Sequence, residues 1–155
     1  MKKIITLLIL MVLLIPSIFA KDGLSVGGSL DVDMGSNKDT IASGSLNVEY
    51  KPIDVFSLGF KLTGKTDFSE SLTATPAIFA RLYPFGGAFL EGSMGGNILW
   101  KGNVINLNNL VAGAALGWRI TSGKSYIEPK VNLEYIFGAP EPYSWSAGVG
   151  AGYTF

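Results

Sequence analysis

The sequence of 155 residues contains no histidine and no cysteine. Without cysteine there is no disulfide framework, and a lipoprotein-type acyl anchor has no attachment point. Without either residue, the common nucleophile–base pairs of hydrolases and the common zinc ligand sets cannot be assembled. We therefore expect no catalytic residues, no metal site and no cofactor, and the chain is not expected to be an enzyme.

Charge is scarce as well, since charged residues make up 15% of the chain, with twelve basic and twelve acidic side chains. This balance creates no strong field toward nucleic acid, and nucleic-acid binding is not expected. Asp31 and Asp33 are close enough in sequence to bind a cation together, but we favour the simpler interpretation that they are wall charges paired with basic neighbours. After residue 20 there is no long apolar run, so the rest of the chain contains no candidate transmembrane helix.

The N-terminal segment has the organisation of a secretory signal peptide. Two lysines precede an apolar run over residues 4–15, and residues 18–20 offer a cleavage site. We expect residues 1–20 to be a cleaved signal peptide and residues 21–155 to form one mature domain. The alternative is a retained transmembrane anchor, although the run is shorter than the roughly 20 residues that span a bilayer.

The C-terminal segment, Trp145–Phe155, alternates strictly between apolar and small polar side chains. A period of two predicts a β-strand with one apolar and one polar face. Seven further segments follow the same pattern, each near the roughly nine to eleven residues that a tilted membrane strand needs. The eight expected strands are residues 24–34, 42–51, 55–65, 72–83, 88–99, 109–120, 126–137 and 145–155.

The charged residues of these expected strands all fall on the polar face. A soluble barrel buries its apolar face, whereas a membrane barrel turns that face toward lipid and keeps the polar face inside. The sequence therefore predicts an all-β fold, an eight-stranded antiparallel transmembrane up-and-down β-barrel. Pro76 and Pro129 lie inside expected strands, and we expect a β-bulge or a frayed strand end at each.

Charges that face a narrow lumen need partners, because an unpaired buried charge is costly. If the short hairpin turns set the register, Arg81 faces Glu91 and a similar register sets Arg119 opposite Glu128. We expect a lumen ionic network made of Glu49, Lys61, Arg81, Glu91, Arg119, Glu128, Lys130 and Glu134. An ionic plug and a polar lining for a narrow solute path both fit this set, and we favour the plug because eight strands rarely leave a channel.

Aromatic residues cluster near both ends of the expected strands. We expect an aromatic girdle at the two membrane interfaces that includes Tyr50, Trp100, Trp118, Tyr135 and Trp145. Tyr126, near the shorter connections, belongs to the same expectation. The alternative is that these residues reflect only the general preference of aromatic side chains for strands.

The chain ends in Tyr153-Thr154-Phe155, and Arg81-Leu82-Tyr83-Pro84-Phe85 leads into a glycine-containing turn. Together with the leader and the eight alternating segments, these features resemble the small bacterial outer-membrane β-barrel proteins of the OmpA, OmpX, OmpW and opacity type. The resemblance implies the outer membrane of a diderm bacterium, contact with outer-membrane lipid, and recognition of Tyr153 and Phe155 as an assembly signal by the barrel assembly machinery. This group shares a fold and not one activity.

Three functional hypotheses follow. The first is a monomeric, non-enzymatic protein with a structural or surface-interaction role and a lumen filled by polar side chains. The second is a narrow pore or conduit for small solutes or hydrophobic compounds, with an apolar mouth lined by Leu99, Val104, Ile105 and Leu107. The third is a soluble secreted calyx, which would not remain with the membrane on fractionation.

Overall fold

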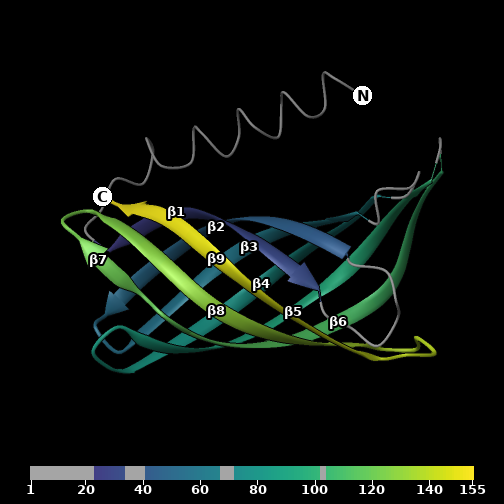
Figure 1. The fold of residues 1–155 in the computed structure, drawn as a ribbon. Helices are drawn as coiled ribbons and strands as arrows, with labels where there is room; N and C mark the ends of the chain where they lie inside the picture. The colour runs from purple at the N-terminus through teal and green to yellow at the C-terminus, as the bar shows by residue number, and fades with distance from the viewer. Residues whose placement is uncertain (1–22, 34–40, 67–71, 102–103) are drawn as a thin grey trace.

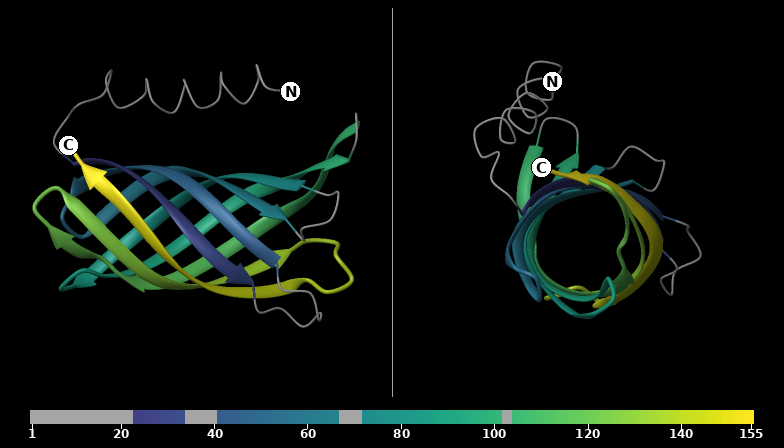
Figure 2. Two further views of the ribbon diagram at one scale, coloured as in Figure 1. Left: turned by 45° about the horizontal axis from the view of Figure 1, so that its top comes forward. Right: turned by 90° about the vertical axis from the view of Figure 1, so that its left-hand side faces the viewer.

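The computed structural model describes residues 23–33, 41–66, 72–101 and 104–155, and these form a closed antiparallel β-barrel (Figures 1 and 2). The expected signal peptide, residues 1–20, lies outside the described residues. Among the residues that are described, no helix has the length and apolar character needed to cross a membrane.

Nine strand segments build the barrel. Their bounds are β1 (Leu24–Asp33), β2 (Ile41–Ile53), β3 (Phe56–Thr66), β4 (Leu72–Phe85), β5 (Ala88–Lys101), β6 (Val104–Trp118), β7 (Ile120–Ser122), β8 (Ser125–Ile136) and β9 (Tyr143–Thr154). β6 and β7 pair with β8 in one continuous register, with Gly117 opposite Lys130 and Ile120 opposite Ile127. They are therefore two parts of one barrel strand, and the predicted eight-stranded barrel is confirmed.

Closure of the barrel comes from pairing between its first and last strands. β1 and β9 pair antiparallel from Ser25 opposite Thr154 to Asp33 opposite Ser146. Every other strand pairs with its neighbour in sequence, as short hairpin connections require. Seen along its axis, the barrel is a complete ring of strands (Figure 2). The backbone groups of each strand are thus bonded on both sides, which is what a bilayer demands of a β-structure.

The two faces of the strands are inverted relative to a soluble barrel. Large apolar side chains point outward, with Leu30 77%, Ile78 68% and Leu116 65% exposed. Charged side chains point inward, and Glu49 and Arg81 are 0% and 3% exposed. The period-two alternation therefore places the apolar face outside and the polar face inside, as predicted.

The short turns and the C-terminus lie at one end of the barrel, on the left in Figure 1. Backbone hydrogen bonds tie these turns to neighbouring strands: Lys51 N donates to Gly23 O (2.8 Å), and Tyr83 N donates to Val55 O (2.9 Å). Arg119 N likewise donates to the oxygen of Gly87 (2.7 Å), a turn residue with a φ of 88° that glycine adopts without strain. This end of the barrel is therefore a hydrogen-bonded collar.

The connection expected over residues 100–108 is mostly strand. β5 and β6 continue to pair as far as Lys101 opposite Val104, with one register shift between Asn97 and Ile98. The pairing of these two strands thus extends further from the short turns than the sequence pattern predicted. The side chains of Val104, Ile105 and Leu107, proposed for an apolar mouth, lie outside the described side chains.

Pro76 and Pro129 produce neither the expected bulge nor a frayed strand end. β4 and β5 keep one register on both sides of Pro76, and β8 keeps one register with β6 and β7 on both sides of Pro129. Because proline lacks a backbone N–H, the ladder loses contacts locally without shifting. At Pro129 this gap coincides with the break between β6 and β7.

Leu116 and Ser93 allow a test of the face assignment, because they lie on adjacent strands and on opposite faces. Leu116→Asp places a charge against lipid, and we expect it to lower the free energy of unfolding by about 2 kcal/mol. Ser93→Asp places the charge at a half-buried position on the polar face, where neighbouring polar groups and water reduce the cost of the charge, and it should cost clearly less than the charge against lipid. Urea titration in micelles, followed by the mobility of unboiled samples on gels, measures both losses. Equal losses would contradict the face assignment.

Candidate functional site

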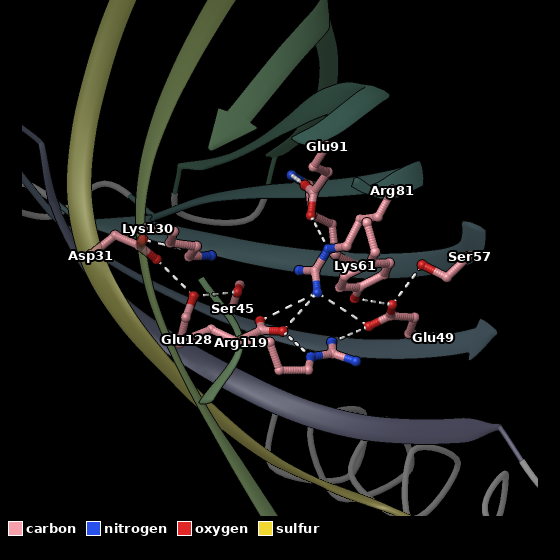
Figure 3. A network of polar contacts seen from close by, with 12 residues as sticks. Asp31, Ser45, Glu49, Ser57, Lys61, Arg81, Glu91, Arg119, Glu128 and Lys130 are labelled. Carbon is pink, nitrogen blue, oxygen red and sulfur yellow. Dashed lines mark hydrogen bonds and ion pairs between the residues drawn. The ribbon is translucent and has the colours of Figure 1, made fainter. Parts of the chain in front are cut away.

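The two arginines of the chain, Arg81 and Arg119, lie at the centre of the lumen network (Figure 3). Arg81 projects inward from β4, and Arg119 projects inward from the break between β6 and β7. Both lie near the short-turn end of the barrel. Arg81 is four residues before Phe85, where β4 ends, and Arg119 is three residues before Ser122, where β7 ends. The surrounding carboxylates come from other strands, so the site exists only in the closed barrel.

Arg81 contacts three carboxylates. Its Nε donates to Glu91 Oε2 (2.7 Å), directly across the β4–β5 hairpin as the sequence predicted. Its Nη1 donates to Glu49 Oε2 (3.1 Å) and to Glu128 Oε1 (3.0 Å). With the Arg81 side chain 4% exposed, these are charge-assisted bonds in a water-poor setting, where such bonds are strongest.

Arg119 shares two of these carboxylates. Its Nε donates to Glu128 Oε1 (2.5 Å), which agrees with the cross-strand pairing expected from the turn, and its Nη2 donates to Glu49. Lys61 on β3 adds a third positive charge by donating to Glu91 Oε1 (2.7 Å). The six charges therefore sum to zero, with three cations balanced by three carboxylates.

Glu49 is the most deeply buried charge of the site, and its carboxylate is fully bonded. Besides the two arginines, Ser57 Oγ (2.5 Å) and the Tyr83 hydroxyl (2.6 Å) donate to its Oε1. A buried carboxylate is tolerated only when its lone pairs are satisfied in this way. Ser57 and Tyr83 were not part of the predicted network.

Four inward aromatic rings surround the arginines, and sequence reasoning missed them as part of the site. The Arg81 guanidinium lies 5.0 Å from the ring centroid of Phe79 and 4.5 Å from that of Phe89. The Arg119 guanidinium lies 5.3 Å from Tyr83 and 4.2 Å from Tyr126. These are cation–π distances. The sequence did contain a signal for their position. Each ring lies two residues from a charged side chain on its own strand and therefore faces the same side of the sheet.

The placement of Tyr126 corrects an expectation. It was expected at the membrane interface, but it is 3% exposed and faces the lumen. Its ring lies against Gly152, its direct partner on β9, where an added Cβ would collide with the ring. Phe79 opposite Gly59 and Phe89 opposite Gly117 repeat this arrangement. The inner-face glycines therefore provide the room that the large inward rings need.

Lys130 and Glu134, both predicted for the network, are placed apart from the arginines. Lys130 Nζ lies 3.6 Å from Asp31 Oδ1, and Asn132 Nδ2 donates to the same oxygen (2.9 Å). Glu134 pairs with Lys65, and their side chains are 23% and 19% exposed. These pairs lie further from the short turns than the arginines do. The sequence did not predict this separation, because strand order alone does not say which charges lie at the same height in the lumen.

The predicted girdle residues mostly face outward at the strand ends. Tyr50, Trp118 and Trp145 are 45%, 44% and 46% exposed. Tyr135 is half-buried and packs against the rings of Phe137 and Tyr143. The side chain of Trp100 lies outside the described side chains.

The proposed assembly signal lies on the closing strand and just beyond it. Tyr153 is 43% exposed, and its ring centroid lies 5.3 Å from that of Phe155. The backbone N–H of Phe155 donates to Leu24 O (2.9 Å), so the terminal residue helps to join the last strand to the first. Recognition of this pair by the assembly machinery remains a prediction.

No protein-family model matches the sequence, and no curated protein sequence matches it either. Solved structures do match the fold. Neisserial surface protein A matches with a TM-score of 0.65 at 10% identity, over 85% of this chain and 96% of that one. The N-terminal barrel of Pseudomonas aeruginosa OprF (TM-score 0.52, 15% identity) and Ail of Yersinia pestis (0.51, 14%) each match over 87% of this chain and all of theirs. At such identities the similarity establishes the fold alone, which is that of the small eight-stranded outer-membrane β-barrels.

Glu49 and Glu134 allow the energetic weight of the arginine network to be measured. Glu49→Gln keeps the shape of the side chain but leaves two buried arginines short of a counter-charge. We expect a loss of about 3–5 kcal/mol in the free energy of unfolding. Glu134→Gln removes a partly exposed pair and should cost less than about 1 kcal/mol. Denaturant unfolding in micelles measures both, and a loss for Glu49→Gln no larger than that for Glu134→Gln would refute the assignment.

Gly152 and Gly92 test the fit between ring and glycine. Gly152→Ala puts a methyl group into the Tyr126 ring, so the ring must move and disturb its contact with Arg119. We expect a loss of about 1–3 kcal/mol from this overpacking. Gly92→Ala is the control, because an added Cβ there meets nothing within 4 Å. If thermal unfolding in micelles shows both variants equally stable, Tyr126 does not depend on the glycine.

Proposed function

We propose that this chain, which has the fold of the small eight-stranded outer-membrane β-barrels, is an integral outer-membrane protein whose lumen is closed by side chains. In this proposal the protein is exported by a cleaved leader, has no catalytic activity, and serves a structural or surface-interaction role. The barrel is surrounded by outer-membrane lipid along its apolar band.

The observation that carries the proposal is the bond between Glu49 and Arg119. Glu49 lies on β2 and Arg119 on the β6–β7 strand, and these are four strands apart in either direction around the eight-stranded ring. Their bond therefore crosses the full width of the lumen. Arg81 on β4 and Glu128 on β8 add a second crossing contact. A solute cannot pass this level without breaking buried ion pairs.

The outward face supports the location. Large apolar side chains are exposed around the whole barrel, from Leu30 on β1 to Val149 on β9. A soluble protein rarely exposes so extensive an apolar surface, so a lipid-facing barrel is favoured over a secreted calyx. The similarity to solved outer-membrane barrels supports the same location.

A narrow conduit is the second candidate, and one observation favours it. The charges further from the short turns, Lys65 and Glu134, are 19% and 23% exposed, whereas the side chains of the arginine network nearest the turns, Glu49 and Arg119, are 0% and 9% exposed. The half of the lumen away from the short turns is thus more accessible. With the arginine network in place, this half of the lumen is closed at its inner end. Without that network it would be the entrance of a channel.

Single-channel recording separates the two candidates. We expect refolded residues 21–155 to be silent in a planar bilayer, with folding checked by the mobility of unboiled samples. The double variant Glu49→Ser/Arg119→Ser removes the contact that spans the full width of the lumen and keeps the net charge of the protein. The Arg81–Glu128 contact stays in place, so we expect only small discrete steps. Lys65→Ser/Glu134→Ser is the matched control and should stay silent. Reproducible steps from the folded wild-type chain would overturn the plug in favour of the conduit.

A further inference from the structure

The short-turn mouth of the barrel contains a polar cavity next to the arginine network. Its volume is about 310 Å³, and its walls include Lys51, Asp54, Tyr83, Arg119 and Thr121. We call this cavity the short-turn vestibule. Arg119 and Tyr83 belong both to the vestibule and to the plug, so the cavity lies directly against the closed level of the lumen.

Two cations of the vestibule flank one aromatic ring. Lys51 Nζ lies 4.6 Å from the ring centroid of Tyr83, and the Arg119 guanidinium lies 5.3 Å from the same centroid. Arg119 is already neutralised by Glu49 and Glu128. Lys51 differs, because no carboxylate of the described chain lies within ion-pair distance of its ammonium group. The vestibule thus holds one uncompensated cation beside a second cation.

The vestibule is also held in shape before any ligand binds. The backbone N–H groups of Lys51, Tyr83 and Arg119 each donate to a neighbouring segment at 2.7–2.9 Å, as part of the collar. A site whose groups are already fixed loses little entropy on binding. Asp54 is the acidic group that lines the cavity, and it is exposed on the turn before β3.

We propose that the short-turn vestibule binds a small oxyanion, a carboxylate or a phosphate group, through Lys51 with support from Arg119 and the hydroxyl of Thr121. Because Arg119 is already paired, the choice between anion and cation depends on Lys51 and Asp54. Lys51 is half-buried in the cavity without a carboxylate partner, whereas Asp54 is exposed on the turn, where water screens its charge, so an anion is favoured over a cation. Asp54 weakens the site by repulsion. A bound oxyanion beside Arg119 competes with Glu49 and Glu128 for that guanidinium, so occupancy of the vestibule is coupled to the plug.

NMR titration of the refolded chain in a non-ionic maltoside detergent tests the proposal, since phosphocholine detergents carry the ligand's own chemistry. Inorganic phosphate and acetate are titrated separately at constant ionic strength, which distinguishes the two oxyanion types. We expect saturable shifts at the Lys51 amide and the Arg119 side chain for at least one of them. Lys51→Gln should weaken binding by at least about threefold, and Asp54→Asn should strengthen it.

Lys124→Gln is the matched control. Lys124 is a lysine at the same end of the barrel, but it lies 5.9 Å from the ring centroid of Tyr153 and does not line the vestibule. Its loss should leave binding unchanged. The proposal is overturned if neither anion gives a saturable shift, if Lys124→Gln weakens binding as much as Lys51→Gln, or if Asp54→Asn weakens it. The titration does not depend on whether the lumen conducts, so the two proposals fail separately.

Discussion

The constraint on which the structure depends is that a chain in a bilayer must bond every backbone polar group to itself. Pairing of β1 with β9 meets this constraint by leaving no free edge across the membrane. Closure gives the sheet an outer face and an inner face, and the strict alternation of the sequence places the apolar side chains on the outer face, toward lipid. The charged side chains of the described strands are then directed into a narrow interior, where they must be paired.

The interior solves this problem with one connected site. Two arginines, three glutamates and Lys61 balance one another, and aromatic rings fill the space around the guanidinium groups. The rings fit because glycines lie opposite them on adjacent strands. The paired charges, the rings and the glycines therefore depend on one another for their fit inside the barrel. The same contacts that stabilise the barrel also fill its lumen. The short-turn vestibule lies next to this site, and Arg119 belongs to both.

Period-two alternation was enough to predict the strands and their faces, and turn positions were enough to predict the pairing of Arg81 with Glu91. The Glu49–Arg119 contact could not be predicted in this way, because contacts across the lumen depend on strand tilt and stagger and not on local pattern. The same limit explains why Lys130 was assigned to the arginines although it pairs with Asp31. Tyr126 lies near a strand end, where an interfacial ring is expected, but it shares the parity of Glu128 and therefore faces the lumen.

The central claim is that both arginines are sealed inside the lumen by carboxylates. Because the chain contains two arginines, ¹⁵N-arginine labelling of the refolded barrel gives two Nε–H signals, one from Arg81 and one from Arg119. The most direct measurement is their rate of hydrogen exchange with water at neutral pH. We expect both signals to be visible and to exchange far more slowly than those of a free guanidinium, with exchange at Arg119 accelerated in Glu49→Gln. Exchange of both wild-type signals at the rate of an exposed arginine would contradict a closed lumen.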